Sequence, residues 1–467
     1  MPTPPFTTLP IATIALDSAS VTATNSTISR TLANRFADVV NVKDSGATGN
    51  GVTDDTAAIQ TAINGANSNS TYSVYFPPGI YLVGNLTLPS NVGLYGPQTY
   101  GRGGYNGAIL KSNGATGYMI SMPNGTTSWS SVNGLHLQGT GTGISAGGIY
   151  IGTSGNIWNS VRACFFENWG NEAIYDKGNA SEIASCVAYQ CLQIRTRGAQ
   201  AGAVTMAGTD SYMHDCEWTA SVYPGNGGPT SNGYCAAGYL TLGGGFFITN
   251  TVFEESDYGL VIDCPTIPHI CNCRADINYL DGFLGGAQFA NCWALNNSQA
   301  GSNLYSGYNQ NFGQVSQYIG CRADGSNHKY GFSNPGSFGT PYNRSIFLGC
   351  ASYGHVTGVY QGTGFYATEN LFHTIGGVTT AAQFAGATGA TPDVTNTTIL
   401  DLGGQGVVTI TNFLNGLPLQ EIKVIGDGSQ TIANNSNIQT NTGANKTLIG
   451  GLAYPFILHN NKWREIL

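Results

Sequence analysis

A four-residue pattern returns along the middle of the chain: an apolar residue, a variable residue, a small or Asn-like residue, and then usually Cys. The eight copies end at Cys164, Cys186, Cys216, Thr251, Cys273, Cys292, Cys321 and Cys350. Successive copies lie 19 to 35 residues apart, a spacing that suits the coils of a solenoid and is too irregular for repeats of fixed length such as propeller blades. The pattern therefore predicts one recurring corner per coil, with loops of variable length elsewhere.

The residues of the pattern also predict the backbone at each corner. The first residue is always apolar and is expected to face inward, whereas the third is Asn, Asp, Gly, Ser or Ala, a set rich in residues that tolerate a left-handed turn. In the strand that follows, period-two alternation directs Cys and the residue two positions later inward. The residues one and three positions after Cys are then expected to face outward.

The cysteines are expected to form a column of small buried side chains with free thiols. The chain has 11 Cys, an odd number. Equivalent residues of adjacent coils would lie about 4.8 Å apart, in a regular stack that suits packing better than pairing. A zinc site needs clustered Cys-X-X-Cys spacings, which Cys271 and Cys273 do not provide. We expect no metal site and no cofactor.

The apolar spacing changes on both sides of the repeat. Residues 53–63 are predicted to form an amphipathic helix that Thr53 or Asp54 can cap, and such a helix can cover the open end of a solenoid core. Its apolar stripe consists of Ala58, Ile59, Ala62 and Ile63. Residues 374–396, rich in Gly, Ala and Thr, are predicted to be a linker, and short alternating strands are predicted after it.

Composition limits the classes of function. Only 9% of the residues are charged and 66 are Gly, which is typical of an elongated all-β protein with many turns. The net charge of -8 offers no basic surface, so nucleic acid is not expected as a partner. The chain has no apolar run of about 18 residues, and Met1 to Pro10 lacks the charged start and apolar core of a signal peptide. We expect neither membrane insertion nor Sec-dependent export, with synthesis in a host cytoplasm.

Two neighbouring segments resemble known proteins. Residues 42–63, which begin ValLysAspSerGlyAlaThrGlyAsnGlyValThrAspAsp, resemble the opening motif of the pectate-lyase-like superfamily of right-handed parallel β-helices. Residues 30–44, ArgThrLeuAlaAsnArgPheAlaAspValValAsnValLysAsp, are similar to the junction before the β-helix in bacteriophage tailspikes. Ser45 stands where family members often carry Phe. The resemblance implies a homotrimer on the virion tail that recognises, and usually depolymerises, a bacterial surface polysaccharide.

The resemblance and the composition together divide the chain into four parts. Residues 1–40 would be an arm or adaptor that contacts other phage tail or baseplate proteins. Residues 41–373 would be an all-β, right-handed parallel β-helix with a short N-terminal capping helix, which carries receptor binding and catalysis. The linker at 374–396 would lead to residues 397–467, a β-sandwich-like domain for trimerisation or carbohydrate binding.

The outward positions of the predicted coils contain a group of carboxylates. Glu254 and Asp276 stand three positions after the corner on adjacent coils, so their backbones should lie about 4.8 Å apart. Opposed like charges destabilise a strand pair, and they raise the pKa of one carboxyl group, as a general acid beside a base or nucleophile requires. Glu255 and Asp257 follow Glu254 into the turn as further candidate catalytic groups.

Charged and aromatic residues on the same face are candidates for binding a sugar chain. They are Glu217, Tyr258, Arg274, Trp293 and Arg322. Arg274 has an alternative role, because it could neutralise Glu254 and Asp276 in a surface ion network. Asp215 occupies the turn position of its corner and is expected to be structural, and Trp218 is expected in the core.

Three functions remain open at this stage. A glycoside hydrolase would use two carboxyl groups, one to protonate the leaving oxygen and the other to activate water or attack the anomeric carbon. A polysaccharide lyase would need a base such as His214, Tyr258 or Lys177 and a uronic acid in its substrate. A receptor-binding spike would bind the glycan and leave it intact. The excess of carboxylates over basic candidates favours hydrolysis.

Overall fold

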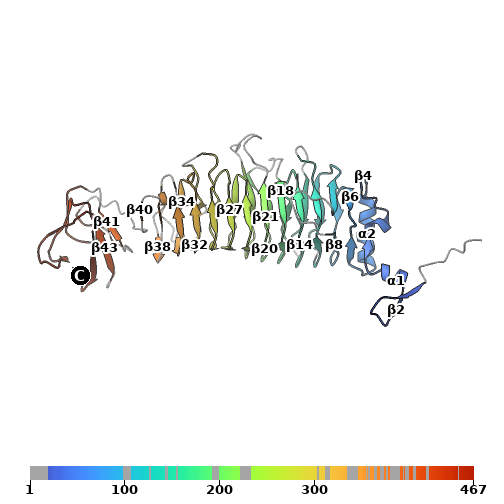
Figure 1. Ribbon diagram of the computed structural model, residues 1–467, viewed down its shortest axis with the longest axis horizontal. Coiled ribbons are helices and arrows are strands. Elements are labelled where there is room, and N and C mark those ends of the chain that lie inside the picture. The colour runs from blue at the N-terminus through green and yellow to red at the C-terminus, as the bar shows by residue number, and fades with distance from the viewer. Residues whose placement is uncertain are drawn as a thin grey trace, which may run out of the picture. The chain divides into compact units, whose positions relative to one another are not determined.

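The structure is a computed structural model of the chain (Figure 1). The residues it describes are 19–97, 107–125, 128–141, 146–153, 156–191, 199–220, 233–301, 304–310, 316–333, 345–353, 355, 358–361, 365–368, 373–374, 377–378, 390–392, 394, 399–402, 406–416, 420–450 and 452–466. The chain divides into two compact units, Met1–Leu284 and Gly285–Leu467, and each is described by itself.

A short hairpin and a short helix precede the coils of the first unit. Strand β1 (Ser20–Thr22) pairs antiparallel with β2 (Ser29–Thr31). Helix α1 (Leu32–Phe36) follows directly, and the Thr31 hydroxyl accepts a hydrogen bond from its first turn. Residues 1–18 of the predicted arm lie outside the described residues.

Helix α2 (Thr56–Ser68) covers the beginning of the coils, where it packs against β3 (Val40–Asn41), β5 (Ser73–Tyr75) and β7 (Leu86–Thr87) (Figure 1). The predicted helix is therefore confirmed. Its buried residues are Ile59, Ala62, Ile63 and Ala66. Ala58 of the predicted stripe is only half-buried.

The start of α2 differs from the prediction by one residue. Asp55 occupies the N-cap position, but its carboxylate makes no capping bond and accepts hydrogen bonds from the backbone N–H groups of Thr48 and Gly49 at 2.7 and 3.0 Å. Asp54 instead accepts a hydrogen bond from the backbone N–H of Thr56 at 2.9 Å. Asp55 thus fixes the preceding loop, whereas Asp54 satisfies a free N–H group at the helix start.

Three parallel sheets form the coils of the first unit, and each full coil adds one strand to each sheet in chain order. Sheet 1 contains β3, β5, β8 (Gly93–Tyr95), β11 (Ser131–Asn133), β14 (Ser160–Arg162), β17 (Glu182–Ala184), β20 (Tyr212–His214), β23 (Phe247–Thr249) and β26 (His269–Cys271). Sheet 2 contains β4 (Asn50–Asp54), β6 (Gly79–Val83), β9 (Ala108–Ser112), β12 (His136–Gln138), β15 (Phe165–Glu167), β18 (Val187–Cys191), β21 (Glu217–Ala220), β24 (Val252–Glu254) and β27 (Arg274–Asp276). Sheet 3 contains β7, β10 (Gly117–Met122), β13 (Ala146–Ile151), β16 (Ile174–Asp176), β19 (Ala199–Met206), β22 (Gly233–Thr241), β25 (Tyr258–Asp263) and β28 (Phe283–Leu284). The fold is a right-handed parallel β-helix, as the sequence predicts.

The corner between sheets 1 and 2 has the predicted backbone in every copy. Two residues separate the strands, and the first of them has a left-handed conformation with φ between 49° and 63°. These residues are Ala163, Ser185, Asp215, Asn250, Asn272, Asn291, Gly320 and Gly349. The second residue points inward, as its burial at all eight corners shows. Because this turn has a fixed length, it aligns the outer faces of sheets 1 and 2 from coil to coil.

The interior contains the predicted cysteine column. All 11 Cys are free thiols, and all except the half-buried Cys271 are buried. Phe166, Trp218 and Phe253, the inward neighbours of the column in sheet 2, are fully buried. The free thiols and the core position of Trp218 are both confirmed.

Coils of the same type occur in the second unit. Their first sheet contains β29 (Gln288–Ala290), β32 (Ser316–Ile319), β35 (Ser345–Leu348) and β38 (Phe365–Thr368); the second contains β30 (Trp293–Leu295), β33 (Arg322–Asp324) and β36 (Ala351–Tyr353); the third contains β31 (Tyr308–Asn309), β34 (Tyr330–Ser333) and β37 (Gly358–Gln361). Aromatic rings replace aliphatic side chains in this core. Phe289, Tyr318 and Phe347 stack with centroids 5.3 and 4.8 Å apart.

Two small sheets near the C-terminus share a hydrophobic core that includes Ile410, Ile422, Phe456 and Trp463. One sheet contains β41 (Ile399–Asp401), β43 (Glu421–Ile425), β47 (Ala453–His459), β48 (Lys462–Glu465) and β45 (Ile438–Gln439), and the other contains β42 (Val408–Ile410), β44 (Gln430–Ile432) and β46 (Lys446–Thr447). Strands are thus present in the alternating segments predicted there. Most of the predicted linker at 374–396 lies outside the described residues. None of the helices in the described residues has the length and apolar character needed to cross a bilayer.

Candidate functional site

The outward column predicted from the corner pattern exists on sheet 2. Thr219, Glu254 and Asp276 are consecutive partners in the parallel register of β21, β24 and β27. Glu217 and Arg274 begin their strands two residues earlier and share the same face, because alternate residues of a strand point the same way. The pairing of Glu254 with Asp276 is therefore as predicted. The charged group formed by Glu217, Glu254, Arg274 and Asp276 is called the carboxylate cluster below.

Arg274 lies between the two acids of the predicted pair. Its guanidinium is 3.6 Å from a Glu254 carboxylate oxygen and 3.5 Å from an Asp276 carboxylate oxygen. Neither contact is a close hydrogen bond, and the Arg274 side chain is 40% exposed. The carboxyl groups are covered more deeply, with exposed fractions of 15% for Glu254 and 9% for Asp276. Arg274 therefore moderates the negative charge of the pair without neutralising either member through a tight ion pair.

Glu254 has the most perturbed acidity in the carboxylate cluster. The pKa of Glu254 is raised to about 7, mainly by burial and then by the charge of Glu217, a hydrogen bond with the Glu217 carboxyl group and the charge of Glu255, against the opposing effect of Arg274. Glu217 lies diagonally across from Glu254 on the neighbouring strand. A carboxyl group that stays protonated near neutral pH beside an ionised one is the arrangement that acid catalysis requires.

Asp276 occupies a different electrostatic position. Burial raises its pKa above the usual range, whereas the positive charge of Arg274 and a hydrogen bond from the backbone of Ile277 lower it. Arg274 thus stabilises the ionised form of Asp276 from one side of the carboxyl group. Glu254 and Asp276 can therefore carry one proton between them, and Glu254 is the group that donates it as the acid.

Three other predicted residues of this region have distinct positions. Glu255 follows Glu254 in a left-handed conformation with φ of 50°, is half-buried, and contributes its charge to the acidity of Glu254. Asp257 is fully buried and Tyr258 is 7% exposed, because the chain turns inward to begin β25 in sheet 3. Contrary to the prediction that they continue the surface of the carboxylate cluster, Asp257 and Tyr258 belong to the interior.

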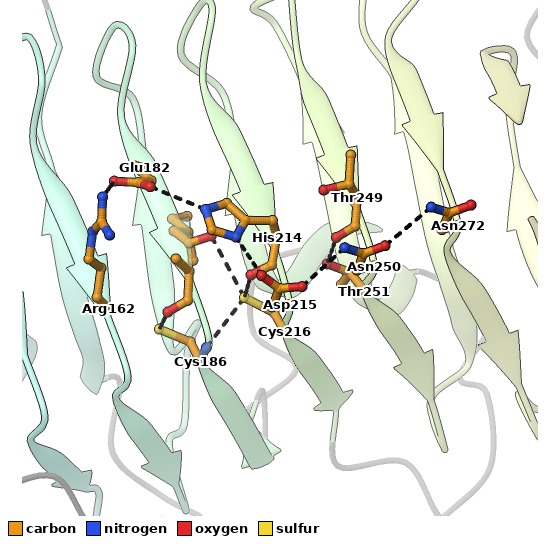
Figure 2. Close-up of polar contacts among 12 residues, drawn as sticks. Arg162, Glu182, Cys186, His214, Asp215, Cys216, Thr249, Asn250, Thr251 and Asn272 are labelled. Carbon is orange, nitrogen blue, oxygen red and sulfur yellow. Dashed lines mark hydrogen bonds and ion pairs between the residues drawn. The ribbon is translucent and has the colours of Figure 1, made fainter.

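His214 takes part in a surface network along sheet 1 (Figure 2). Its Nδ1 lies 2.8 Å from Asp215 and its Nε2 lies 3.1 Å from Glu182, which is also bound by Arg162. The hydrogen bond with Asp215 is the main cause that raises the pKa of His214. A ring with a carboxylate at each nitrogen is held in its protonated form and has no free nitrogen to accept a substrate proton. The geometry therefore does not favour His214 as the base of a lyase.

Asp215 connects this network to the corner residues of the following coils (Figure 2). The Asn250 side chain donates a hydrogen bond to the Asp215 carboxylate at 3.2 Å, and Asn272 donates one to Asn250 at 3.3 Å. These three residues are successive left-handed corners, so the side chains form a ladder that satisfies polar groups from coil to coil. The structural role predicted for Asp215 agrees with this position.

Trp293 and Arg322 form a cluster within the second unit. The Trp293 indole donates a hydrogen bond to the Asp324 carboxylate at 3.0 Å, and Arg322 forms an ion pair with the same carboxylate at 2.5 Å. The Arg322 guanidinium lies 5.1 Å from the Trp293 ring centre and 5.2 Å from that of Tyr353. Trp293 and Arg322 are thus held by each other and by Asp324, rather than standing as separate sugar contacts. Asp324 and Tyr353 stand three positions after Cys321 and Cys350, which is the outward position of the corner pattern.

The outer face of sheet 3 carries polar aromatic residues that sequence reasoning largely missed. Lys177 lies 4.8 Å from the Tyr175 ring centre, and the Tyr239 hydroxyl donates a hydrogen bond to Asp263 at 3.1 Å. Burial raises the pKa of Tyr239 to about 12. The segments that contain these tyrosines lie outside the corner pattern, so that pattern could not align them. Across the described residues, His, Cys, Asp and Glu form no group of three or more that could hold a metal ion.

Comparisons with known proteins agree with this architecture. Residues 39–164 match the family described as rhamnogalacturonase A/epimerase, pectate lyase-like. The chain is 37% identical over 119 residues to mannuronan C5-epimerase AlgE1 of Azotobacter vinelandii, an alignment that covers 23% of this chain and 8% of the epimerase. The chain thus spans less than a tenth of the length of that curated relative. Residues 39–164 form a pectate-lyase-like domain.

Two solved structures align with the chain at low sequence identity. The A-module of mannuronan C-5 epimerase AlgE4 of Azotobacter vinelandii aligns with a TM-score of 0.47 and 18% identity, over 70% of this chain and 99% of the module. The Dettilon tailspike protein aligns with a TM-score of 0.48 and 13% identity, over 95% of this chain and 81% of the tailspike. The sheets and corners define the chain as a right-handed parallel β-helix protein, and residues 39–164 of it match the pectate-lyase-like family.

Proposed function

We propose that this protein is an endo-acting glycoside hydrolase that cleaves a bacterial surface polysaccharide, whether capsular, exopolysaccharide or O-antigen. The observation that carries the proposal is the position of Glu254 between two carboxyl groups, with a pKa of about 7. Glu254 can then donate a proton to the leaving glycosidic oxygen at neutral pH, while an ionised carboxylate serves as base or nucleophile.

Geometry distinguishes the roles of the two neighbouring acids. Glu217 is hydrogen-bonded to Glu254, so the two carboxyl groups leave no space for a sugar carbon or a water between them. Asp276 is the register partner of Glu254 on the adjacent strand, and Arg274 lies near both carboxyl groups. In retaining enzymes the two carboxyl groups are about 5 to 5.5 Å apart, and in inverting enzymes about 6.5 to 9.5 Å. We assign the nucleophile or base to Asp276, and to Glu217 the positioning role of keeping Glu254 protonated.

Product analysis tests this proposal directly. The purified protein would be incubated with a panel of capsules and lipopolysaccharides, and the fragments analysed by mass spectrometry. Hydrolysis adds the mass of water to each cleaved bond, and Glu254→Gln and Asp276→Asn should each abolish it. Glu421→Gln, which changes an exposed glutamate of β43, is the matched control and should leave the product pattern unchanged. Unsaturated fragments that persist in both cluster variants would refute the hydrolase assignment.

Proton abstraction from a uronic acid is a second candidate, favoured by the contact between Lys177 and Tyr175 on sheet 3. The family description names lyase-like and epimerase proteins, whose names refer to such chemistry. A lyase would release fragments with unsaturated ends. An epimerase working in heavy water would incorporate deuterium into the polymer and leave its length unchanged. Either result should be lost in Lys177→Met and retained in Glu254→Gln.

We further propose that the protein acts as a homotrimeric tailspike, whose N-terminal arm attaches to other tail or baseplate proteins. The support is the similarity of residues 30–44 to the junction before the β-helix in phage tailspikes. Light scattering of the full chain tests the trimer. A monomer at micromolar concentration would exclude it, while leaving the hydrolase proposal open to the product analysis above.

A further inference from the structure

Two tryptophans stand exposed at equivalent positions of neighbouring coils, away from the carboxylate cluster. Trp129 is 61% exposed and Trp158 is 53% exposed, and their rings lie nearly parallel with centroids 5.7 Å apart. Each precedes a sheet 1 strand by two residues: Trp129 before β11 and Trp158 before β14. Trp169, Trp218 and Trp463 are buried, as is usual for tryptophan. The exposure of Trp129 and Trp158 therefore requires a separate explanation.

The backbone at these two positions does not suit tryptophan. Trp129 and Trp158 have φ values of 62° and 60°, in the left-handed region that bulky residues rarely occupy. The equivalent residues of neighbouring coils are also left-handed: Asn91, Ala180, Asp210 and Gly245. Most of these are residues that the conformation favours. The protein thus places its two largest exposed rings where a small or Asn-like residue would be more stable, and strain of this kind concentrates at functional sites.

Backbone hydrogen bonds fix the two rings as neighbours. The N–H of Asn91 donates to the carbonyl of Ser128 at 2.9 Å, that of Trp129 donates to Ile157 at 3.1 Å, and that of Trp158 donates to Asn179 at 3.2 Å. These three coils therefore bond to the next coil in the same way. Because the backbone is anchored, the parallel arrangement of the indoles follows from the fold and does not depend on a ligand.

The residues that flank the pair are small and polar, and the charged side chains on the neighbouring sheet 1 positions, Arg162 and Glu182, form an ion pair with each other. Asn91 and Asn179 on the flanking coils are exposed, and the sheet 1 residues beside the pair are Gly93, Ser131 and Ser160. In the described residues neither indole N–H has a hydrogen-bond acceptor. A stable protein interface buries roughly 800 Å² per partner, far more than two rings can offer, so a protein partner is not favoured. A phosphate ligand is not favoured either, because no basic side chain stands among the described residues of this column.

We propose that Trp129 and Trp158 form a stacking platform for a neutral pyranose polysaccharide, separate from the carboxylate cluster. The C–H faces of a pyranose ring pack on an indole face, and the indole N–H and flanking amides can bond to its hydroxyl groups. The two rings match successive positions along an extended glycan. The platform lies on the coils three and four before that of Glu254 and on the far side of the corner, so it holds the polymer without contacting the reacting bond.

Tryptophan fluorescence of the full chain tests the platform. Of the 6 Trp, Trp169, Trp218 and Trp463 are buried and Trp293 is half-buried, so emission accessible to acrylamide comes mainly from the exposed pair. The probes are neutral hexose-rich capsular and O-antigen polysaccharides, with polymannuronate as the anionic comparison. The measurement would use the Glu254→Gln chain, so that binding is read independently of cleavage. We expect at least one neutral polysaccharide to reduce acrylamide quenching at least twofold, and polymannuronate to have no effect.

Substitution with asparagine separates binding from folding, because asparagine suits the left-handed backbone. Trp129→Asn and Trp158→Asn should each weaken polysaccharide binding, measured by calorimetry, at least tenfold, without lowering the unfolding midpoint. Asp210→Asn, at the same column position, is the matched control and should bind normally. The proposal is overturned if no neutral polysaccharide of the panel protects the fluorescence, or if only polymannuronate does. It is also overturned if both Trp variants bind normally while changing the oligomeric state, since the pair would then be a subunit contact.

Discussion

Glu254 and Asp276 are register partners on adjacent parallel strands, and a single guanidinium, that of Arg274, lies within 3.6 Å of both carboxyl groups. Two acids and one cation leave the group with a net negative charge, and Glu217 adds to it. Burial and this excess of negative charge together explain why one carboxyl group retains its proton near neutral pH. It also means that Arg274 can polarise the pair without abolishing its acidity.

Replacement of Glu254 by glutamine should remove the proton donor while preserving the shape of the side chain. General acid catalysis typically contributes about 10² to 10⁴ in rate, so kcat on the cleaved polysaccharide should fall by a factor in this range. Reducing-end release under saturating substrate would measure it. A loss below tenfold, with Glu421→Gln behaving as the unchanged protein, would mean that Glu254 is not the acid.

The pH dependence of cleavage should report Glu254. Because its pKa is about 7, the protonated form is lost as the pH rises through neutrality, and kcat should decline on that side. Glu217→Gln removes one of the charges that raise this pKa, so the declining limb should move to lower pH. Initial rates between pH 5 and 9 would show the shift; an unchanged limb would exclude Glu217 as the residue that sets the acidity.

The same shift has a consequence for stability. A carboxyl group whose pKa is higher in the folded state favours folding below its unfolded value of 4.5, and that contribution is lost as the pH rises through about 7. Glu254→Gln should therefore raise the unfolding midpoint at pH 8 relative to the parent and have less effect at pH 4.5. Calorimetric scans at the two pH values would test this. Equal effects at both would contradict the assigned acidity.

His214, a basic residue whose pKa is also raised, gives a second test of how stability depends on pH. Its pKa is raised by Asp215 and Glu182, so its contribution to folding is fully present below 6.5 and is lost as the pH rises through the elevated folded value. His214→Gln should destabilise the protein by about 1 kcal/mol at pH 6, given the modest strength of partly exposed ion pairs, and by less at pH 9. Urea unfolding would measure the difference, with His459→Gln as the control. If cleavage also disappeared at every pH, His214 would have a chemical role after all.

Thiol reactivity should follow the burial of the cysteine column. All 11 thiols are free, and burial raises the pKa of Cys191 to about 12 and that of Cys186 well above the usual range. Thiolates are the reactive species, so the native protein should react with a disulfide reagent slowly and first at the half-buried Cys271. In denaturant all 11 should react. Rapid reaction of several thiols in the native state would show that the coils open locally.

The corners could be predicted from sequence because their chemistry is local. A residue that tolerates a left-handed turn, followed at once by a small buried Cys, fixes two backbone conformations and the facing of the next strand. The register of Glu254 with Asp276 follows from counting forward from Asn250 and Asn272. The helix of residues 56–68 was similarly visible from its apolar spacing.

The remaining features depend on distances between coils that the pattern does not contain. Asp257 was a candidate catalytic group in the turn after Glu254, but only three residues separate Glu254 from the start of sheet 3, and the Asp257 side chain is buried there. The role of Glu217 was underestimated because it lies diagonal to Glu254, at a position defined by side-chain reach and not by register. Trp129 and Trp158 precede the recurring corner, so no spacing identified them as neighbours.

The two-residue corner has a constant length, whereas the segments that connect sheet 2 to sheet 3 differ in length from coil to coil. Strand alignment is determined where sheets 1 and 2 meet, whereas the segments that join sheet 2 to sheet 3 range from the two residues between β6 and β7 to the twelve between β30 and β31. A segment can therefore be lengthened, shortened or exchanged without displacing the carboxylates on the neighbouring strands. Specificity for a new glycan could therefore arise by replacement of one connecting segment. The coils and the carboxylate cluster would remain unchanged.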